Sequence, residues 1–265
     1  MKQRTVLTIA GSDSSGGAGI QADLKTMEAL GVYGMSVITA LTAQNTLGVR
    51  GISPVEKSFI SLQLEAVCSD MPVDAVKIGM LPDIGAMEAV AKGIDKFGLT
   101  NVVLDPVLSS TSGTEFTKDN TYEYLKKKLF PRCLIITPNI PEAQILTGRD
   151  INSRKNAEEA AAHIYESCGC NVLIKGGHSS FDQIGVSADL FYNSDAIWIE
   201  GRRYENPNTH GTGCTLSSAI ASGLAMGLEP VNAVIQAKKY IEKCIAAGLE
   251  LGHGRGPLYH SMRAN

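Results

Sequence analysis

The chain has 265 residues, of which 44% are hydrophobic and 19% are charged, a composition that supplies a sizeable core and excludes a disordered protein. The formal net charge is −3, and no Lys- or Arg-rich block stands out beyond the short run Lys126–Lys128, so nucleic acid is not expected as the main partner. The length is that of one large domain or at most two.

No targeting or membrane segment is recognised. Met1 leads directly into a strand-like run without an apolar signal segment, and no apolar stretch is long enough to span a bilayer. The six cysteines are scattered, and the spacing of Cys168 and Cys170 suits neither a redox pair nor a zinc site. We therefore expect a cytoplasmic protein with reduced thiols, no structural metal and no membrane contact.

Short β-branched runs alternate with helical patterns along the whole chain. In chain order we expect a strand at 6–10, a helix at 20–30, a strand at 36–41, a helix at 59–68, a strand at 75–78, a helix at 84–97, a strand at 101–104, a helix at 121–129, a strand at 134–137, helices at 141–146 and 156–167, a strand at 172–175, an antiparallel hairpin at 186–192 and 196–200, and helices at 213–226 and 230–250. Several strands are continuous apolar runs, as expected of parallel strands covered on both faces. These repeated units predict one doubly wound α/β sandwich over residues 1–265.

Polar and glycine residues follow the predicted strands. They occur at 11–13, 42–45, 79–80, 105–106, 138–139 and 176–178. Ligands bind at the carboxyl ends of the strands in sheets of this kind. The sequence therefore predicts a single composite site at that edge of the sheet.

The most informative segment is 206–215, which reads Asn-Pro-Asn-Thr-His-Gly-Thr-Gly-Cys-Thr and leads into a predicted helix. Gly211 and Gly213 let an anion approach the first amides of that helix, where the helix dipole also favours negative charge. Cys214 lies in the same field, which is expected to lower the pKa of its thiol. The segment indicates an anion cradle that contains a base, or else an ordinary glycine turn before a buried helix. The neighbouring His210 is interpreted as structural.

A second glycine-rich segment, residues 11–19, follows the first strand and fits a loose dinucleotide-binding pattern. Such a site needs an acidic residue at the end of the second strand, and residues 40–45 contain no carboxylate. A nicotinamide oxidoreductase is therefore a weak alternative. The chain also contains no G-x-x-x-x-G-K-[ST] motif, so a P-loop is excluded.

Two carboxylates and a lysine stand where phosphate chemistry needs them. Asp105 ends one strand, and Glu142 lies in the first turn of a helix that begins near Pro141. Together they are able to share one Mg²⁺ with nucleotide phosphates, although Asp105 alone would more often form a turn and Glu142 alone a helix cap. Lys175, which ends another strand, either neutralises a transferring phosphate or extends to solvent.

These segments together resemble the ribokinase-like superfamily and, within it, the hydroxymethylpyrimidine/phosphomethylpyrimidine kinases of thiamine biosynthesis. The resemblance runs nearly end to end, and the order of its motifs is highly specific. The motifs occupy residues 10–26, 39–46, 77–80, 105–107, 137–142, 175–177, 208–215 and 254–257. The resemblance implies a ribokinase-like three-layer αβα sandwich with a mostly parallel central sheet.

The resemblance also implies an ATP- and Mg²⁺-dependent kinase of 4-amino-5-hydroxymethyl-2-methylpyrimidine and of its monophosphate. Cys214 would be the catalytic base, at a position that is aspartate in ribokinases, and the anion hole would comprise Gly211, Thr212 and Gly213. The nucleotide would be bound by Asn139, Glu142, Lys175 and Thr209, with Lys175 also acting in catalysis. Asp105 and Glu142 would be the metal ligands.

By the same resemblance the pyrimidine pocket would draw on Asp23, Gln44, Met80 and Val107. The amide of Gln44 suits this role because it offers both a donor and an acceptor to an aminopyrimidine edge. Leu108 stands where methionine is common in the family, a change that conserves side-chain volume. A homodimer is the assembly that the family implies.

Two further alternatives stay open. Pyridoxal kinases belong to the same subfamily, but the specialised members are expected to differ around residues 42–44 and to carry alanine where this chain has Thr212, so the pyrimidine is favoured. A catalytically silent relative would bind the pyrimidine or a nucleotide as a sensor. The intact set of catalytic and metal-binding candidates argues against that interpretation.

Overall fold

The structure is a computed structural model that describes residues 3–107, 119–177, 179, 181–206 and 208–262. Its main strands are β1 (Thr5–Ala10), β2 (Tyr33–Ile38), β5 (Ala75–Ile78), β6 (Val102–Leu104), β7 (Ile135–Ile136), β8 (Asn171–Ile174), β9 (Val186–Tyr192) and β10 (Ala196–Arg202). Within the described residues these eight strands form one sheet in the order β10-β9-β8-β7-β6-β5-β1-β2. The pairs from β2 to β8 are parallel, whereas β9 pairs antiparallel with both β8 and β10.

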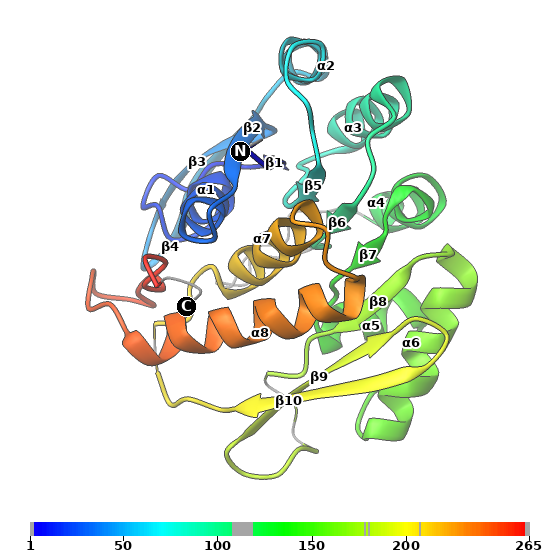
Figure 1. Ribbon diagram of the computed structural model, residues 1–265, viewed down its shortest axis with the longest axis vertical. Helices are drawn as coiled ribbons and strands as arrows, with labels where there is room; N and C mark the ends of the chain where they lie inside the picture. Colours follow the sequence, from blue (N-terminus) through cyan, green and yellow to red (C-terminus); the bar gives the residue numbers. More distant parts are fainter. Residues whose placement is uncertain (1–2, 108–118, 178, 180, 207, 263–265) are drawn as a thin grey trace.

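Helices cover both faces of this sheet (Figure 1). They are α1 (Gly19–Ala29), α2 (Lys57–Cys68), α3 (Ile84–Phe97), α4 (Asp119–Tyr124), α5 (Ile140–Thr147), α6 (Arg154–Cys168), α7 (Thr212–Ala225) and α8 (Pro230–Ala247). One apolar core packs α2, α3, α5 and α6 against the sheet, and the other packs α1, α7 and α8 against the opposite face. The predicted three-layer αβα sandwich with a mostly parallel sheet is confirmed.

The predicted strand 36–41 is correct only for residues 36–38, which end β2, because the chain leaves the main sheet at Thr39. The Thr39 hydroxyl donates to the Met80 carbonyl at 2.7 Å, and the backbone then enters β3 (Ala40–Asn45). β3 pairs antiparallel with β4 (Gly48–Pro54), a strand that the sequence pattern did not predict, and the two form a separate sheet. Gln44 therefore belongs to a strand beside the main sheet and not to a loop after its second strand.

The predicted helix 121–129 is also divided, into α4 and a π-helical turn at Leu125–Leu129, which is followed by a 3₁₀ turn at Phe130–Arg132. The other helices begin and end within a few residues of their predicted bounds. Among the described residues, no helix combines the length and the apolar character that crossing a membrane requires.

Parallel pairing explains where the polar residues meet. β1, β5, β6, β7 and β8 all run in the same direction, so the segments that follow them reach one edge of the sheet. α7 packs across the same sheet and begins at this edge, as Figure 1 shows. The topology thus places residues from five strand ends opposite the first turn of one helix.

Candidate active site

A cavity of about 1110 Å³ lies at the carboxyl edge of the sheet. Its wall includes segments that follow β1, β5, β6, β7 and β8, together with β3 and the turn before α7. Of the residues expected from the sequence, the wall contains Gln44, Met80, Asp105, Val107, Asn139, Glu142, Lys175, Thr209, Gly211, Thr212, Gly213 and Cys214. Asp23 is not among the lining residues. The structure therefore brings all the expected residues except Asp23 to one cavity.

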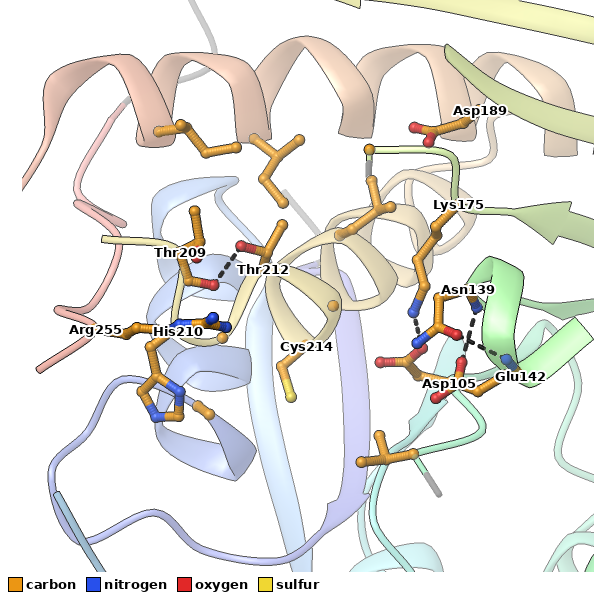
Figure 2. Close-up of a pocket in the computed structure, with 18 of the residues that line it drawn as sticks. Asp105, Asn139, Glu142, Lys175, Asp189, Thr209, His210, Thr212, Cys214 and Arg255 are labelled. Atoms are coloured by element: carbon orange, nitrogen blue, oxygen red, sulfur yellow. Dashed lines mark hydrogen bonds and ion pairs between the residues drawn. The ribbon is translucent and has the colours of Figure 1, made fainter. Parts of the chain in front are cut away.

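The turn before α7 packs tightly against the glycine-rich loop after β1. Gly211 caps the helix with a φ of +85°, and a Cβ at this position would lie 1.9 Å from the Gly17 carbonyl oxygen. Only glycine fits both the backbone conformation and this contact. The Thr212 hydroxyl donates to the Thr209 carbonyl at 2.6 Å, which stabilises the turn. Figure 2 shows Thr212 and Cys214 projecting from this first stretch of α7.

The pKa of the Cys214 thiol differs from the expectation. Burial raises this pKa above its ordinary value, and the charge of the Lys77 ammonium lowers it by less than burial raises it. The prediction that the helix start would lower the pKa is therefore wrong. Removal from water destabilises the thiolate more than the nearby positive charge stabilises it. Cys214 is a thiol at neutral pH and becomes a better base as the pH rises.

A cluster of charged residues lies across the cavity from α7 (Figure 2). Asp105 Oδ1 accepts hydrogen bonds from the Lys175 ammonium at 2.6 Å and from the Thr137 hydroxyl at 2.9 Å. Burial by itself would lower the pKa of Lys175, but the negative charges of Asp105 and Glu142 outweigh this effect and raise it. Lys175 is therefore positively charged at neutral pH.

Asn139 and Glu142 form a capping box at the start of α5. The Asn139 side chain accepts from the Glu142 backbone N–H, and the Glu142 carboxylate accepts from the Asn139 backbone N–H, each at 2.8 Å. Glu142 therefore has the helix-capping role that was the structural alternative in the sequence analysis. The same carboxylate also lines the cavity, so the cap holds a negative charge at the wall.

The space around Asp105 suits a divalent cation shared with phosphate oxygens. A Cβ on Gly213 would lie 2.9 Å from Asp105 Oδ2 and 3.4 Å from the Lys175 ammonium, so the glycine leaves a gap bordered by both charges. Mg²⁺ usually binds one or two protein carboxylates and takes its other ligands from water and substrate phosphates. Asp105 and Glu142 fit that pattern. In the part of the chain that the structure describes, no group of three or more His, Cys, Asp or Glu side chains is arranged to hold a metal by itself.

Three of the four residues expected in the pyrimidine pocket lie on the cavity wall. Gln44, Met80 and Val107 lie on the cavity wall. Gly11 makes room for Met80, because a Cβ on this glycine would lie 2.3 Å from the end of the methionine side chain. Leu108, which follows Val107, lies outside the described residues.

Asp23 is a correction to the predicted site. Its side chain is fully buried between α1, β1, β5 and α7, where both carboxylate oxygens lie 2.8 Å from the Lys77 ammonium. The hydroxyls of Thr8 and Ser218 also donate to it, at 2.6 and 2.7 Å. Asp23 faces the interior because it neutralises Lys77, a partner that the sequence pattern did not identify. Ser218, which donates to Asp23, lies one helical turn after Cys214 on α7.

His210 and Asp13 contribute a contact that the sequence did not reveal. His210 Nε2 lies 2.8 Å from Asp13 Oδ2 and 3.2 Å from Gln44 Nε2, and all three residues line the cavity. His210 thus joins the turn before α7 to the loop after β1 and to β3. Asp13 and His210 are 197 residues apart, so no local sequence pattern indicates that they touch. The only available signal was that each lies in a glycine-rich segment.

The far end of the cavity contains charged residues that no motif singled out. The Lys238 ammonium lies 2.8 Å from Asp189 Oδ2, and Asp189 Oδ1 accepts from the Gly176 backbone N–H at 2.8 Å. Glu242 lines the same region, and burial raises the pKa of its carboxyl. These side chains come from β9 and α8, whose surfaces read as ordinary strand and helix faces in the sequence.

The six cysteines are free in the structure. Cys133 and Cys170 lie in one apolar core and Cys244 in the other, where burial raises the pKa of each thiol. Cys214 differs from these three because it reaches the cavity. It is therefore the cysteine that stands in position for chemistry.

Comparisons with known proteins agree with this geometry. Residues 13–259 match the family model described as phosphomethylpyrimidine kinase. The hydroxymethylpyrimidine/phosphomethylpyrimidine kinase of Rhizobium meliloti is 47% identical over 262 residues, which cover 97% of each chain. The crystal structure of phosphomethylpyrimidine kinase from Clostridium difficile is 43% identical with a TM-score of 0.81, over 92% of this chain and 100% of its own. The pyridoxal kinase of Bacillus subtilis, solved as an ADP complex, is 36% identical with a TM-score of 0.89 over 98% of each chain. The protein thus belongs to the phosphomethylpyrimidine kinase family, within the ribokinase-like kinases.

Proposed function

We propose that this protein uses ATP to phosphorylate the hydroxymethyl group of 4-amino-5-hydroxymethyl-2-methylpyrimidine and then the resulting monophosphate, in thiamine biosynthesis. The observation that carries the proposal is the shared cavity, which is lined by Cys214, the Lys175–Asp105 pair and Gln44. A base, a phosphate-binding cluster and an amide for the pyrimidine edge are the three parts that this transfer needs. The family membership of the chain supports the same reaction.

In this proposal the hydroxymethyl oxygen attacks the γ-phosphorus of ATP, the bond between the γ-phosphorus and the bridging oxygen breaks, and ADP leaves. The proton of the hydroxymethyl group passes to Cys214 in its thiolate form. The backbone amides of Gly211, which caps α7, and of Thr212 and Gly213, which begin it, would face the charge that develops on the migrating phosphoryl group. Lys175 would add a positive charge from the opposite wall. A bound Mg²⁺, held by Asp105 and Glu142, would supply further neutralisation of the phosphate oxygens. Asn139 and Thr209 would contact the nucleotide. Phosphoryl transfer depends mainly on positioning and charge, so these groups would provide most of the rate enhancement.

The second candidate is pyridoxal kinase, as a main or side activity. The observation that favours it is the likeness to the Bacillus subtilis pyridoxal kinase, whose TM-score of 0.89 extends over 98% of both chains. Thr212 and the segment 42–44 favour the pyrimidine, by the resemblance set out above. The two activities use the same phosphate machinery, so only a comparison of substrates separates them.

A coupled assay of ADP release with the pyrimidine, its monophosphate and pyridoxal tests the proposal. We expect kcat/KM for the pyrimidine to exceed that for pyridoxal by at least about tenfold, because the wrong ring leaves the Gln44 amide without its hydrogen-bond partners. A higher value for pyridoxal would assign the chain to the second candidate. Binding of the pyrimidine without ADP release would instead support a sensor.

The proposed metal ligands predict a specific change in Asp105→Asn. Asparagine keeps an oxygen for Thr137 and Lys175 but removes the negative charge, so the Mg²⁺ concentration that half-saturates nucleotide binding should rise by at least about tenfold. Calorimetry of ADP binding at increasing Mg²⁺ measures this directly. Asp195→Asn, in the exposed turn between β9 and β10, is the matched control. Equal Mg²⁺ dependence in both variants would remove Asp105 from the metal site.

We propose that the whole chain forms one kinase domain, that it acts in the cytoplasm, and that it assembles as a homodimer without nucleic-acid partners. Exposed apolar residues on the small sheet, Leu41 and Ile52, and in the turn between its strands, Leu47, support a subunit contact there. Light scattering on the purified protein determines the mass of the assembly.

A further inference from the structure

The neighbouring Asp13 carboxylate determines that the Nε2 atom of the His210 ring carries a hydrogen. Asp13 Oδ2 accepts from the backbone N–H groups of Gly17 and Ala18 at 3.2 and 2.8 Å, and Oδ1 accepts from Ser15. Burial alone would raise the pKa of Asp13, but these bonds and the His210 contact lower it to about 2. Asp13 is therefore an acceptor at neutral pH, and His210 Nε2, 2.8 Å from Oδ2, must carry the hydrogen.

The hydrogen of the Thr42 hydroxyl is fixed as well. Thr42 Oγ1 donates to the Ser12 carbonyl at 2.7 Å, a bond between β3 and the loop after β1. A hydroxyl has one hydrogen, so Thr42 presents only a lone pair to its other neighbour, the Gln44 amide, at 3.2 Å. His210 thus offers a donor on one side of Gln44, and Thr42 offers an acceptor on the other.

The Gln44 amide has one orientation that satisfies both neighbours. With Nε2 toward His210 and Oε1 toward Thr42, each at 3.2 Å, a donor faces a donor and an acceptor faces an acceptor. The two ends of an amide have nearly the same shape, and their assignment follows from the hydrogen bonds that they make. Half a turn about the last side-chain bond converts both clashes into hydrogen bonds. Oε1 then accepts from His210 Nε2–H, which it shares with Asp13, and Nε2 donates to Thr42.

We propose that His210 and Thr42 are specificity-determining residues, which lock the Gln44 amide so that it recognises a ring nitrogen acceptor beside an exocyclic amine. An amide has two N–H donors and two acceptor lone pairs. The protein uses one of each, so Gln44 keeps one donor and one acceptor for the substrate. This inference rests on the proposed function of the cavity and explains how the site would choose among pyrimidines.

The 4-oxo analogue of the pyrimidine has its hydrogen-bond donor and acceptor at exchanged positions, so it tests whether the Gln44 amide is held in one orientation. In 4-amino-5-hydroxymethyl-2-methylpyrimidine, N3 accepts and the 4-amino group donates. In the 4-oxo compound, N3 carries a hydrogen and the exocyclic oxygen accepts. The hydroxymethyl group has to reach the same phosphate, so the ring cannot turn over to exchange the two positions. The 4-oxo compound therefore sets oxygen against Oε1 and N–H against Nε2, unless the amide itself rotates.

The test is the ratio of kcat/KM for the 4-amino substrate to that for 5-hydroxymethyl-2-methylpyrimidin-4-one. We expect a ratio of at least about 100 in the natural protein, since a mismatch leaves both groups of the Gln44 amide unpaired against the substrate. His210→Leu removes the donor and frees the amide, so the ratio should fall at least about tenfold. His210→Gln places an amide N–H near the position of Nε2 and should retain most of the ratio. Thr42→Val removes the lone pair on the other side and should lower the ratio as His210→Leu does.

Because both substrates use the same phosphate machinery, general damage to the site slows both and leaves their ratio unchanged. A ratio in His210→Leu and Thr42→Val equal to that of the natural protein would overturn the lock, and so would a natural protein that accepts both pyrimidines equally. Thr42→Val, which is nearly isosteric, keeps the test decisive if His210→Leu fails to fold. Failure of the natural protein to phosphorylate the 4-amino compound would instead overturn the proposed function.

Discussion

Replacing Cys214 by alanine should lower kcat by about 10²–10⁴-fold with the pyrimidine substrate, the range that a positioned general base contributes. The variant loses the group that would accept the hydroxyl proton, but the α7 amides and the Lys175–Asp105 pair remain. Residual activity above background is therefore expected. The melting temperature should change by only a few degrees, because the side chain is only partly buried at the edge of the cavity. Unchanged turnover in this variant would remove Cys214 as the base.

The pH dependence of turnover gives an independent check on Cys214. Since burial raises the pKa of this thiol, the reactive thiolate is scarce at neutral pH and increases as the pH rises. We expect kcat of the natural protein to increase through the neutral and alkaline range until the raised pKa is passed. Cys214→Asp supplies a carboxylate that ionises at much lower pH, so its profile should be flat over the same range. A slope shared by both proteins would assign the pH dependence to another group.

Replacing Asp23 by alanine should lower the free energy of unfolding by about 3–5 kcal/mol, because it leaves the buried Lys77 ammonium without its counter-charge. Both side chains of this pair are 0% exposed. Burial by itself would lower the pKa of Lys77, but the charge of Asp23, together with the charges of Cys214 and Asp105 and the hydrogen bond to Asp23, outweighs burial and raises the pKa. Lys77 is therefore positively charged. The variant also removes the acceptor of the Thr8 and Ser218 hydroxyls. Urea unfolding measures the loss.

A double replacement separates the ion pair from its surroundings. Lys77→Met combined with Asp23→Leu removes both charges and keeps apolar volume, so it should recover much of the stability lost in Asp23→Ala. A loss below about 1 kcal/mol in Asp23→Ala would contradict the buried-pair interpretation. Normal stability together with a raised KM for the pyrimidine would return Asp23 to the substrate site, as the family resemblance implied.

Local patterns predicted most of the fold because the signals lie close together in the chain. Short β-branched and apolar runs with flanking helices predicted β1, β5, β6 and β8 nearly to the residue, and the parallel direction followed from their alternation with helices. The failure at Thr39 has a different origin. The run from 36 to 41 reads as one β-branched and apolar segment, but the chain leaves the sheet at Thr39, whose hydroxyl donates to the Met80 carbonyl, 41 residues away. The hydrophobic periodicity of residues 36–41 does not indicate that Thr39 has a distant hydrogen-bond partner.

In the cavity, too, local sequence signals account for some features and contacts between distant residues for others. The sequence by itself determined which residue types meet at the carboxyl edge, since strand direction and the glycine turn before α7 already imply that Asp105, Lys175 and Cys214 converge. Only the tertiary structure decided how each group is charged and paired. It raised the pKa of Cys214 by burial, turned Asp23 inward to Lys77, and placed His210 between Asp13 and Gln44. The reason is physical: desolvation and hydrogen bonding depend on neighbours in space, and for these residues the neighbours come from distant parts of the chain.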